Sequence, residues 1–186
     1  PVVGAGKKLM GVLSEEQLLD ADNPGVKIGE LLGPEAISIS EKTHVFDVTK
    51  VIMDHNLTTI PVVSEAGKYV GLVRRHDLFE RFARMLATQE SGAIVALEVN
   101  ERSVQLSQII YLIEQNDVRV LSLSTESRDG DDPTVGITIK LNVKEASRIR
   151  HILEHNGYHV VAAFGEEEDS EDLLDRVQEF LRYLEV

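Results

Sequence analysis

Four adjacent residues carry charged or ionisable side chains that could do chemistry: Arg74, Arg75, His76 and Asp77. A guanidinium group can hold a phosphate through two parallel hydrogen bonds, so the two arginines favour an anionic ligand. Lys68 precedes them in the chain and would extend this cationic rim. Another interpretation needs no ligand, because an aspartate in the first turn of a helix is stabilised by the helix dipole alone.

A second group, His151, Glu154 and His155, matches the H-x-x-E-H spelling of inverzincin metalloproteases. Two histidines four residues apart on a helix can bind one metal ion, so a metal-dependent hydrolase is a remote alternative. The same side chains lie opposite the apolar stripe of their helix, which favours an exposed polar face. The chain has no cysteine, no G-x-S-x-G and no glycine-rich phosphate loop. We therefore expect no catalytic residue, no metal and no cofactor.

The elements that position residues 74–77 occur twice in the sequence. Pro61–Glu80 repeats Pro1–Asp20 at an offset of 60, and the two copies share Pro1/Pro61, Gly11/Gly71 and Leu18/Leu78. Each copy is an apolar run, a turn containing glycine, a second apolar run and a helix start. This pattern predicts a hairpin that leads into a helix, the second helix running from about His76 to Leu86.

Residues 34–60 supply further elements before the second copy. Ala36–Ser40 is expected to form a strand, and a helix is expected after Thr43, where Val45, Val48, Val51 and Ile52 recur at helical spacing. Asp54-His55-Asn56 should end that helix. Ala21–Gly33 contains the turn signal Asn23-Pro24-Gly25 and is interpreted as a linker between the repeats.

The two copies resemble cystathionine-β-synthase (CBS) domains, whose βαββα unit ends in PVV–turn–GhhT–xx–DL, where h is apolar. CBS domains pair into Bateman modules, and the resemblance implies an adenosine-containing ligand such as AMP, ATP or S-adenosylmethionine. In that family the Ser/Thr meets phosphate at a helix start, and the Asp accepts hydrogen bonds from the ribose. The first copy has Ser14 at the Ser/Thr position but Gln17 at the Asp position. The second copy has Asp77 at the Asp position but Arg74 at the Ser/Thr position. Ser14 and Gln17 also form a capping-box pattern, which needs no ligand.

The resemblance implies one binding cleft between the repeats, with Asp77 on the ribose, Arg74 or Arg75 on phosphate, and His76 and Ser14 nearby. The aliphatic residues expected around the base are Ile37, Ile39, Leu57, Ile60 and Val62. The first copy lacks the strand and helix that residues 36–60 give the second. We expect that the sequence misses its own N-terminus or that another copy of the chain completes it.

From Gly92 onward the order of elements is strand, helix, strand, strand, helix, strand. Strands are expected at Ala93–Val99, Val118–Ser124, Val135–Leu141 and Val160–Phe164, with a turn at Arg128–Pro133. The two helices are indicated by Leu106–Ile113 and by Val143, Ala146, Ile149 and Leu153, with a stop at Asn156-Gly157. This βαββαβ order is the ferredoxin-like arrangement. It predicts a four-stranded antiparallel sheet with two helices on one face.

Following two CBS-like repeats, this half resembles an ACT domain, a module that binds amino acids or dimerises through its sheet. The ACT signature loop would cover Asn100, Arg102, Ser103 and Val104. Valine stands where the family has glycine, and a β-branched residue resists a positive φ. Dimerisation is therefore expected in preference to amino-acid binding.

Composition limits the possible partners. A net charge of −13 argues against a nucleic-acid groove, and no apolar run is long enough for a membrane helix. Without a leader sequence, the expected location is cytoplasmic. Residues 166–186 hold nine acidic residues against two arginines, and Leu173, Leu174, Val177, Leu181 and Leu184 predict an amphipathic helix there.

The predicted architecture is α+β: residues 1–20 as the second half of a CBS repeat, 21–33 as linker, 34–87 as the second repeat, 92–165 as an ACT-like domain, and 166–186 as an acidic tail with a helix. Residues 88–92 should be the domain boundary. The favoured function is a non-catalytic regulatory protein, present at least as a homodimer. The main alternative is a structural oligomerisation module with vestigial pockets.

Overall fold

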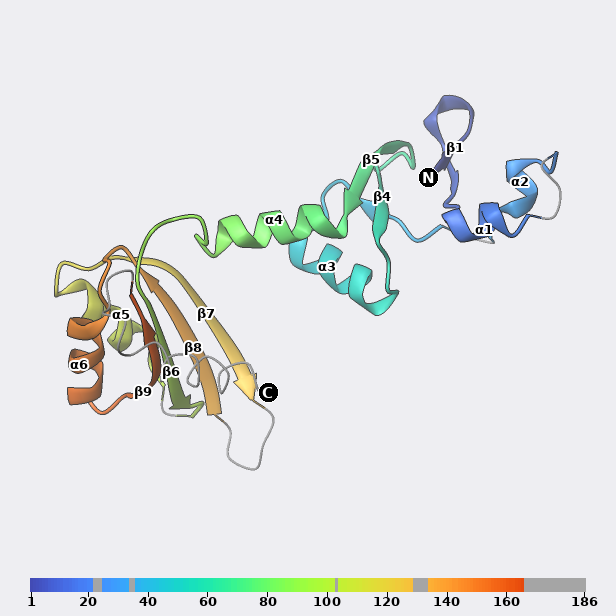
Figure 1. Cartoon of the computed structure of the whole chain (residues 1–186). Helices are drawn as coiled ribbons and strands as arrows, with labels where there is room; N and C mark the ends of the chain where they lie inside the picture. Colours follow the sequence, from blue (N-terminus) through green and yellow to red (C-terminus); the bar gives the residue numbers. More distant parts are fainter. Residues whose placement is uncertain (22–24, 34–35, 103, 129–133, 166–186) are drawn as a thin grey trace. The chain divides into compact units, whose positions relative to one another are not determined.

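The structure is a computed structural model that describes residues 1–21, 25–33, 36–102, 104–128 and 134–165 (Figure 1). The chain divides into two compact units, Pro1–Arg81 and Phe82–Val186. Helix α4 (Arg75–Met85) runs across this division. The predicted boundary at residues 88–92 lies a little later in the chain, and the domain limits stay predictions.

The first repeat has the predicted hairpin followed by a helix. Strands β1 (Val2–Val3) and β2 (Leu9–Gly11) pair antiparallel around the short 3-10 helix η1 (Ala5–Lys7). Helix α1 (Glu15–Leu19) follows, and the predicted capping box is confirmed at its start. The region predicted as a linker contains a short helix, α2 (Ile28–Leu31).

The second repeat forms a three-stranded sheet in the order β3-β4-β5. Its strands are β3 (Ile39–Ser40), β4 (Thr59–Val63) and β5 (Tyr69–Arg74), with helix α3 (Val45–Asp54) between the first two. Strand β3 is parallel to β4, whereas β4 and β5 form the predicted antiparallel hairpin. The predicted strand Ala36–Ser40 is shorter than expected, since only Ile39 and Ser40 pair with β4.

The two hairpins meet in one antiparallel backbone bridge. The bridge joins Lys8 and Lys68, which are equivalent in the repeat. The turns also match, since Lys7 and Gly67 occupy equivalent positions and have φ values of 63° and 71°. Both copies of the sequence repeat therefore contain a hairpin with a positive-φ turn residue.

The second unit has the predicted βαββαβ order. Its elements are β6 (Ile94–Asn100), α5 (Leu106–Glu114), β7 (Val120–Arg128), β8 (Thr134–Leu141), α6 (Ser147–His155) and β9 (His159–Phe164). The antiparallel sheet has the order β7-β8-β6-β9. Placement of Ala93–Val99 and Thr134–Leu141 in one sheet is confirmed, because Ile94 to Asn100 pair with Lys140 to Thr134. The ACT assignment itself stays a prediction.

Alternating burial along the strands explains how this sheet holds its helices. Val135, Ile137, Ile139 and Leu141 are buried, whereas the residues between them are only partly covered. The same core contains residues of both helices, which lie on one face of the sheet (Figure 1): Ile109, Ile113, Ile149 and Leu153. Apolar residues spaced three or four apart on the helices therefore pack against apolar residues spaced two apart on the strands.

One helix boundary was predicted wrongly. Val143 was assigned to the second helix of this unit, but α6 begins at Ser147. The Val143 carbonyl accepts a hydrogen bond from the Ala93 N–H at 2.6 Å, so Val143 continues the strand pairing beyond Leu141. The predicted stop at Asn156-Gly157 is confirmed, because Gly157 has a φ of 85°. The tail 166–186 and most of the turn 128–133 lie outside the described residues.

Gly92 gives a test of this packing. A Cβ atom at Gly92 would lie 2.0 Å from the Leu141 carbonyl oxygen, so the backbone of β6 or β8 would have to move. Gly92→Ala should destabilise the second unit by about 1–3 kcal/mol, the usual cost of overpacking. Urea unfolding with hydrogen exchange of the β6 and β8 amides measures this. The matched control is Gly29→Ala in α2, where nothing lies within 4 Å. Equal stability of Gly92→Ala and wild type would contradict the packing described.

Candidate ligand-binding cleft

A cleft of about 200 Å³ lies between the two repeats of the first unit. The first repeat contributes Gly11, Val12 and Gln17. The remaining lining residues come from the connection and the second repeat: Gly33, Ala36, Ile37, Leu57 and Thr59. All eight lining residues are uncharged, so the cleft itself suits the neutral part of a ligand.

The aliphatic residues predicted around a base divide into two groups. Ile37 and Leu57 line the cleft as expected. Ile39 and Ile60 are buried core residues and, like the half-buried Val62, do not line it. Sequence reasoning missed Gly11, Val12, Gly33, Ala36 and Thr59. The shared pair Gly11/Gly71 was a signal for Gly11, because a repeated glycine next to an apolar run often marks a close approach to the backbone.

Ser14 and Gln17 are occupied at the start of α1. The Gln17 backbone N–H donates to Ser14 Oγ at 3.1 Å, and the Ser14 N–H donates to Gln17 Oε1 at 2.9 Å. These two bonds satisfy N–H groups that the first helical turn cannot pair internally. In this structure Ser14 therefore acts as a helix cap. Gln17 caps as well and also lines the cleft.

Arg74 and Asp77 form an ion pair at the start of α4. The Arg74 Nη2 lies 2.7 Å from Asp77 Oδ1, and Arg74 Nε lies 3.0 Å from the same oxygen. Asp77 Oδ2 also accepts the Arg74 backbone N–H at 2.9 Å. Arginine has no acceptor atom and cannot cap the free N–H groups of a helix, so only the return bond from Asp77 remains of a capping box.

This ion pair shifts the pKa values of both side chains. Hydrogen bonds from the Arg74 side chain, and then from its backbone N–H, hold the pKa of Asp77 below its ordinary value of 3.8. The hydrogen bond to Asp77, followed by the charge of that carboxylate, raises the pKa of Arg74. Both groups are therefore charged at neutral pH.

The ion pair lies next to the cleft along the sheet. Thr59, which lines the cleft, is paired with Arg74 across strands β4 and β5. Directly opposed residues have Cβ atoms about 4.5–5.5 Å apart on the same face of a sheet. Arg74 thus starts at the edge of the cleft, although neither Arg74 nor Asp77 is among the residues that line it.

The other predicted cations have different positions. The Arg75 guanidinium donates to the Leu57 carbonyl at 2.7 Å and to Asn56 Oδ1 at 3.2 Å, so it fixes the connection between α3 and β4. His76 lies 3.2 Å from Glu80 on an exposed helix face. The prediction that Lys68 shares a rim with Arg74 is wrong: strand β5 separates them, and a strand rises roughly 3.3 Å per residue.

The loop expected to be an ACT site makes hydrogen bonds within itself. Asn100 Oδ1 accepts the Arg102 N–H at 3.0 Å, and the Asn100 carbonyl accepts the Val104 N–H at 3.1 Å. Val104 packs against the hydrophobic core. Ser103 lies outside the described residues.

The histidine motif on α6 gives no metal geometry. Glu154 accepts a hydrogen bond from Arg150 Nε at 2.9 Å, and the His151 side chain is 78% exposed. In the part of the chain that the structure describes, no three His, Cys, Asp or Glu side chains converge as metal ligands. Likewise, no described helix combines the length and apolar character required to cross a membrane.

Comparison with known proteins identifies a family for residues 28–84. A family model described as "CBS domain" matches residues 28–84. The magnesium transporter MgtE of Thermus thermophilus is 33% identical over 98 residues, covering 53% of this chain and 21% of the transporter. Inosine-5'-monophosphate dehydrogenase of Korarchaeum cryptofilum is 27% identical over 90 residues, covering 48% of this chain and 19% of the enzyme.

The chain spans about a fifth of the length of these two relatives. Among solved structures, the cytosolic domain of the Mg²⁺ channel MgtE in complex with ATP is 30% identical, with a TM-score of 0.41, over 42% of this chain and 32% of that one. These two relatives differ in overall activity. Residues 28–84 of the chain form a CBS domain.

Proposed function

We propose that the chain is a non-catalytic regulatory module that binds an adenosine-containing ligand, such as AMP, ATP or S-adenosylmethionine, between its repeats. The observation that carries this proposal is the uncharged cleft beside the Arg74–Asp77 pair. The cleft can take an apolar, flat base against Val12, Ile37 and Leu57. The neighbouring pair offers a carboxylate for hydroxyl groups and a guanidinium for phosphate.

Binding would work by partner exchange. In this structure the Asp77 carboxylate accepts hydrogen bonds from the backbone N–H and the side chain of Arg74, so a ligand hydroxyl would compete with the arginine for it. An exposed ion pair is weak, because water screens both charges. A ribose with two adjacent hydroxyls could replace Arg74 on Asp77, and Arg74 would then turn to the phosphate. Ligand binding would thereby alter the start of α4, a helix whose residues belong to both units.

A structural oligomerisation module is the second candidate. It is favoured by the self-contained hydrogen bonds at both helix starts, Ser14 with Gln17 and Arg74 with Asp77. In both candidates the second unit serves mainly for dimerisation, as its ACT-like order of elements suggests. A metal-dependent hydrolase built on His151, Glu154 and His155 has no such support.

Calorimetry on point variants separates these candidates. Asp77→Asn should lower the binding affinity for adenosine and for AMP at least about tenfold, since a charged acceptor for the ribose is lost. Arg74→Ala should weaken AMP to a similar extent and leave adenosine unchanged or tighter, because adenosine has no phosphate and no longer displaces the arginine. Gln17→Ala should weaken both ligands by altering the cleft. Asp47→Asn, which removes an exposed carboxylate on α3 outside the cleft, is the control. No heat from adenosine, AMP, ATP or S-adenosylmethionine with wild type would leave the structural module as the function.

The acid limb of stability tests the ion pair without any ligand. The pKa of Asp77 is lowered in the folded state, so its pair stabilises the fold above the unfolded pKa. This contribution is lost as the pH falls through the lower folded pKa, which places the window below pH 3.8. Urea unfolding should show wild type more stable than Asp77→Asn at about pH 7, with the difference disappearing at the acid end. A difference that stays constant across this range would contradict the pair.

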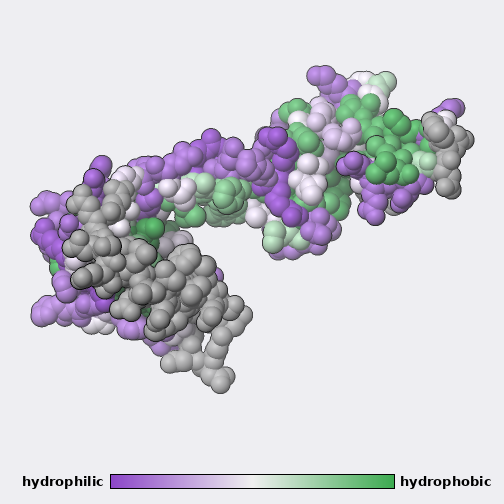
Figure 2. All heavy atoms as spheres, viewed as in Figure 1, coloured by the Kyte–Doolittle hydropathy of each residue, from purple (hydrophilic) through white to green (hydrophobic). Residues whose placement is uncertain are grey.

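Association of the chain is the third test. Large apolar side chains are exposed on the first unit, where Figure 2 shows hydrophobic surface; equivalent Leu19 and Phe79 are 77% and 70% exposed, and α3 exposes Phe46 and Met53. Exposed apolar patches of this kind mark interaction surfaces. Sedimentation should give at least a dimer of the 20.7 kDa chain, and Phe79→Glu should shift it toward monomer. A stable wild-type monomer at micromolar concentration would rule out the homodimer.

A further inference from the structure

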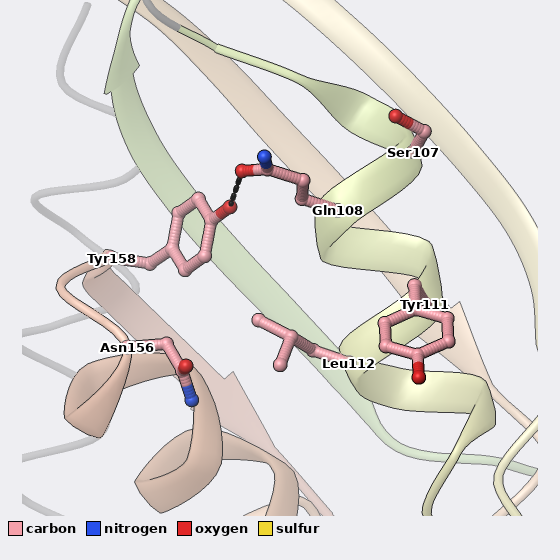
Figure 3. A pocket seen from close by; sticks show the side chains of 6 residues that line it. All are labelled: Ser107, Gln108, Tyr111, Leu112, Asn156 and Tyr158. Atoms are coloured by element: carbon pink, nitrogen blue, oxygen red, sulfur yellow. Dashed lines mark hydrogen bonds between the residues drawn. The ribbon is translucent and has the colours of Figure 1, made fainter.

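A pocket of about 390 Å³ lies in the second unit, between α5 and the connection from α6 to β9 (Figure 3). Four of the pocket's lining residues come from one face of helix α5. The other two follow α6: one is the residue that caps its C-terminal end, and the other directly precedes β9. The lining residues are Ser107, Gln108, Tyr111, Leu112, Asn156 and Tyr158. Its volume falls in the range of about 300–1,000 Å³ that is usual for small-molecule sites.

The pocket has a fixed floor and an open rim. Leu112 and Tyr158 are half-buried and pack against the hydrophobic core of the unit, so their positions are set by the fold. Tyr111 stands on the rim and is 66% exposed. Figure 3 shows the two tyrosine rings on opposite sides, with Leu112 between them. A flat ring entering here would meet the Tyr111 ring at the rim and the apolar Leu112 at the floor.

The pocket contains no charge, and this excludes several ligand classes. None of the six lining side chains is ionisable near neutral pH. A free amino acid would bring a carboxylate and an ammonium group into a site that has no counter-charge for either, which is unfavourable. A phosphate would have no cationic partner for the same reason. The pocket therefore suits an uncharged ligand.

The polar groups supply both donors and acceptors. Asn156 Nδ2 donates to the Ile152 carbonyl at 2.7 Å, which leaves Asn156 Oδ1 as the acceptor of that amide. Tyr158 donates its hydroxyl hydrogen to Gln108 Oε1 across a long 3.5 Å, and the Gln108 NH₂ group provides donors. Because that bond is long and exposed, a ligand edge can replace it at small cost.

We propose that this pocket binds an uncharged, flat heteroaromatic ring of the nucleobase type, with its edge on Gln108 and Asn156 and its face on Tyr111. Amide side chains pair with the adjacent donor and acceptor of adenine, and bases stack on aromatic rings irrespective of sequence. The proposal is independent of the ligand proposed for the CBS domain, since the pocket belongs wholly to the other compact unit.

Residue-resolved NMR on the full chain tests this site with free adenine as the probe. Saturable shifts are expected at residues 107–112 and 156–158. Tyr111→Ala should weaken adenine about fivefold or more, since stacking on one aromatic ring contributes on that scale. Tyr111→Phe keeps the ring and should bind like wild type, and Glu114→Gln at the end of α5 is a control outside the pocket.

Four results would overturn the proposal. The first three are no shift at these residues, shifts confined to residues 1–81, and equal affinity of wild type and Tyr111→Ala. The fourth is binding of free phenylalanine as tightly as adenine, because the pocket should exclude a charged ligand. Absence of AMP binding to the CBS domain would leave this result unaffected, because each compact unit is observed through its own amides.

Discussion

The backbone bridge between Lys8 and Lys68 joins the two hairpins of the first unit, and the cleft lies between the same two repeats. Neither hairpin alone encloses the cleft, because its lining residues come from both repeats. The two hairpins also share a turn residue with positive φ, at Lys7 and Gly67. Glycine adopts this conformation without cost, whereas lysine adopts it at a modest energetic cost.

The same physical requirement is met differently at the two equivalent helix starts. Each helix leaves its first N–H groups without internal partners. In the first repeat Ser14 and Gln17 satisfy two of them reciprocally. In the second repeat Arg74 cannot accept a hydrogen bond, so only Asp77 reaches back, and the arginine side chain is held by the carboxylate instead. The two equivalent helix starts therefore differ in chemistry: the two positions are neutral in the first repeat and charged in the second.

Local pattern was enough to predict most elements of the fold. Alternation along Val135–Leu141 and helical spacing in α3 and α5 each report which face is buried, and these faces agree with the observed core. Gly157 and the Ser14 capping box were predictable because their chemistry involves only neighbouring residues. Val143 was not, because its carbonyl is taken by Ala93, a partner about 50 residues away in the chain.

The candidate site shows why spacing alone cannot complete such a prediction. Ile37, Ile39, Leu57 and Ile60 are all aliphatic and nearby in sequence, but only tertiary packing decides that the first and third line a cleft while the others enter the core. Arg75 and Arg74 are adjacent, yet one guanidinium binds the Leu57 carbonyl and the other a carboxylate. Residue type therefore identified the region of a possible anion site. The hydrogen bond from Arg75 to a backbone carbonyl, which the sequence does not show, leaves Arg74 as the cation available to bind an anion there. A guanidinium held by a backbone carbonyl is fixed as part of the scaffold. One held only by an exposed carboxylate can still exchange its partner, and for that reason Arg74, and not Arg75, is the group through which an anion could act on this fold.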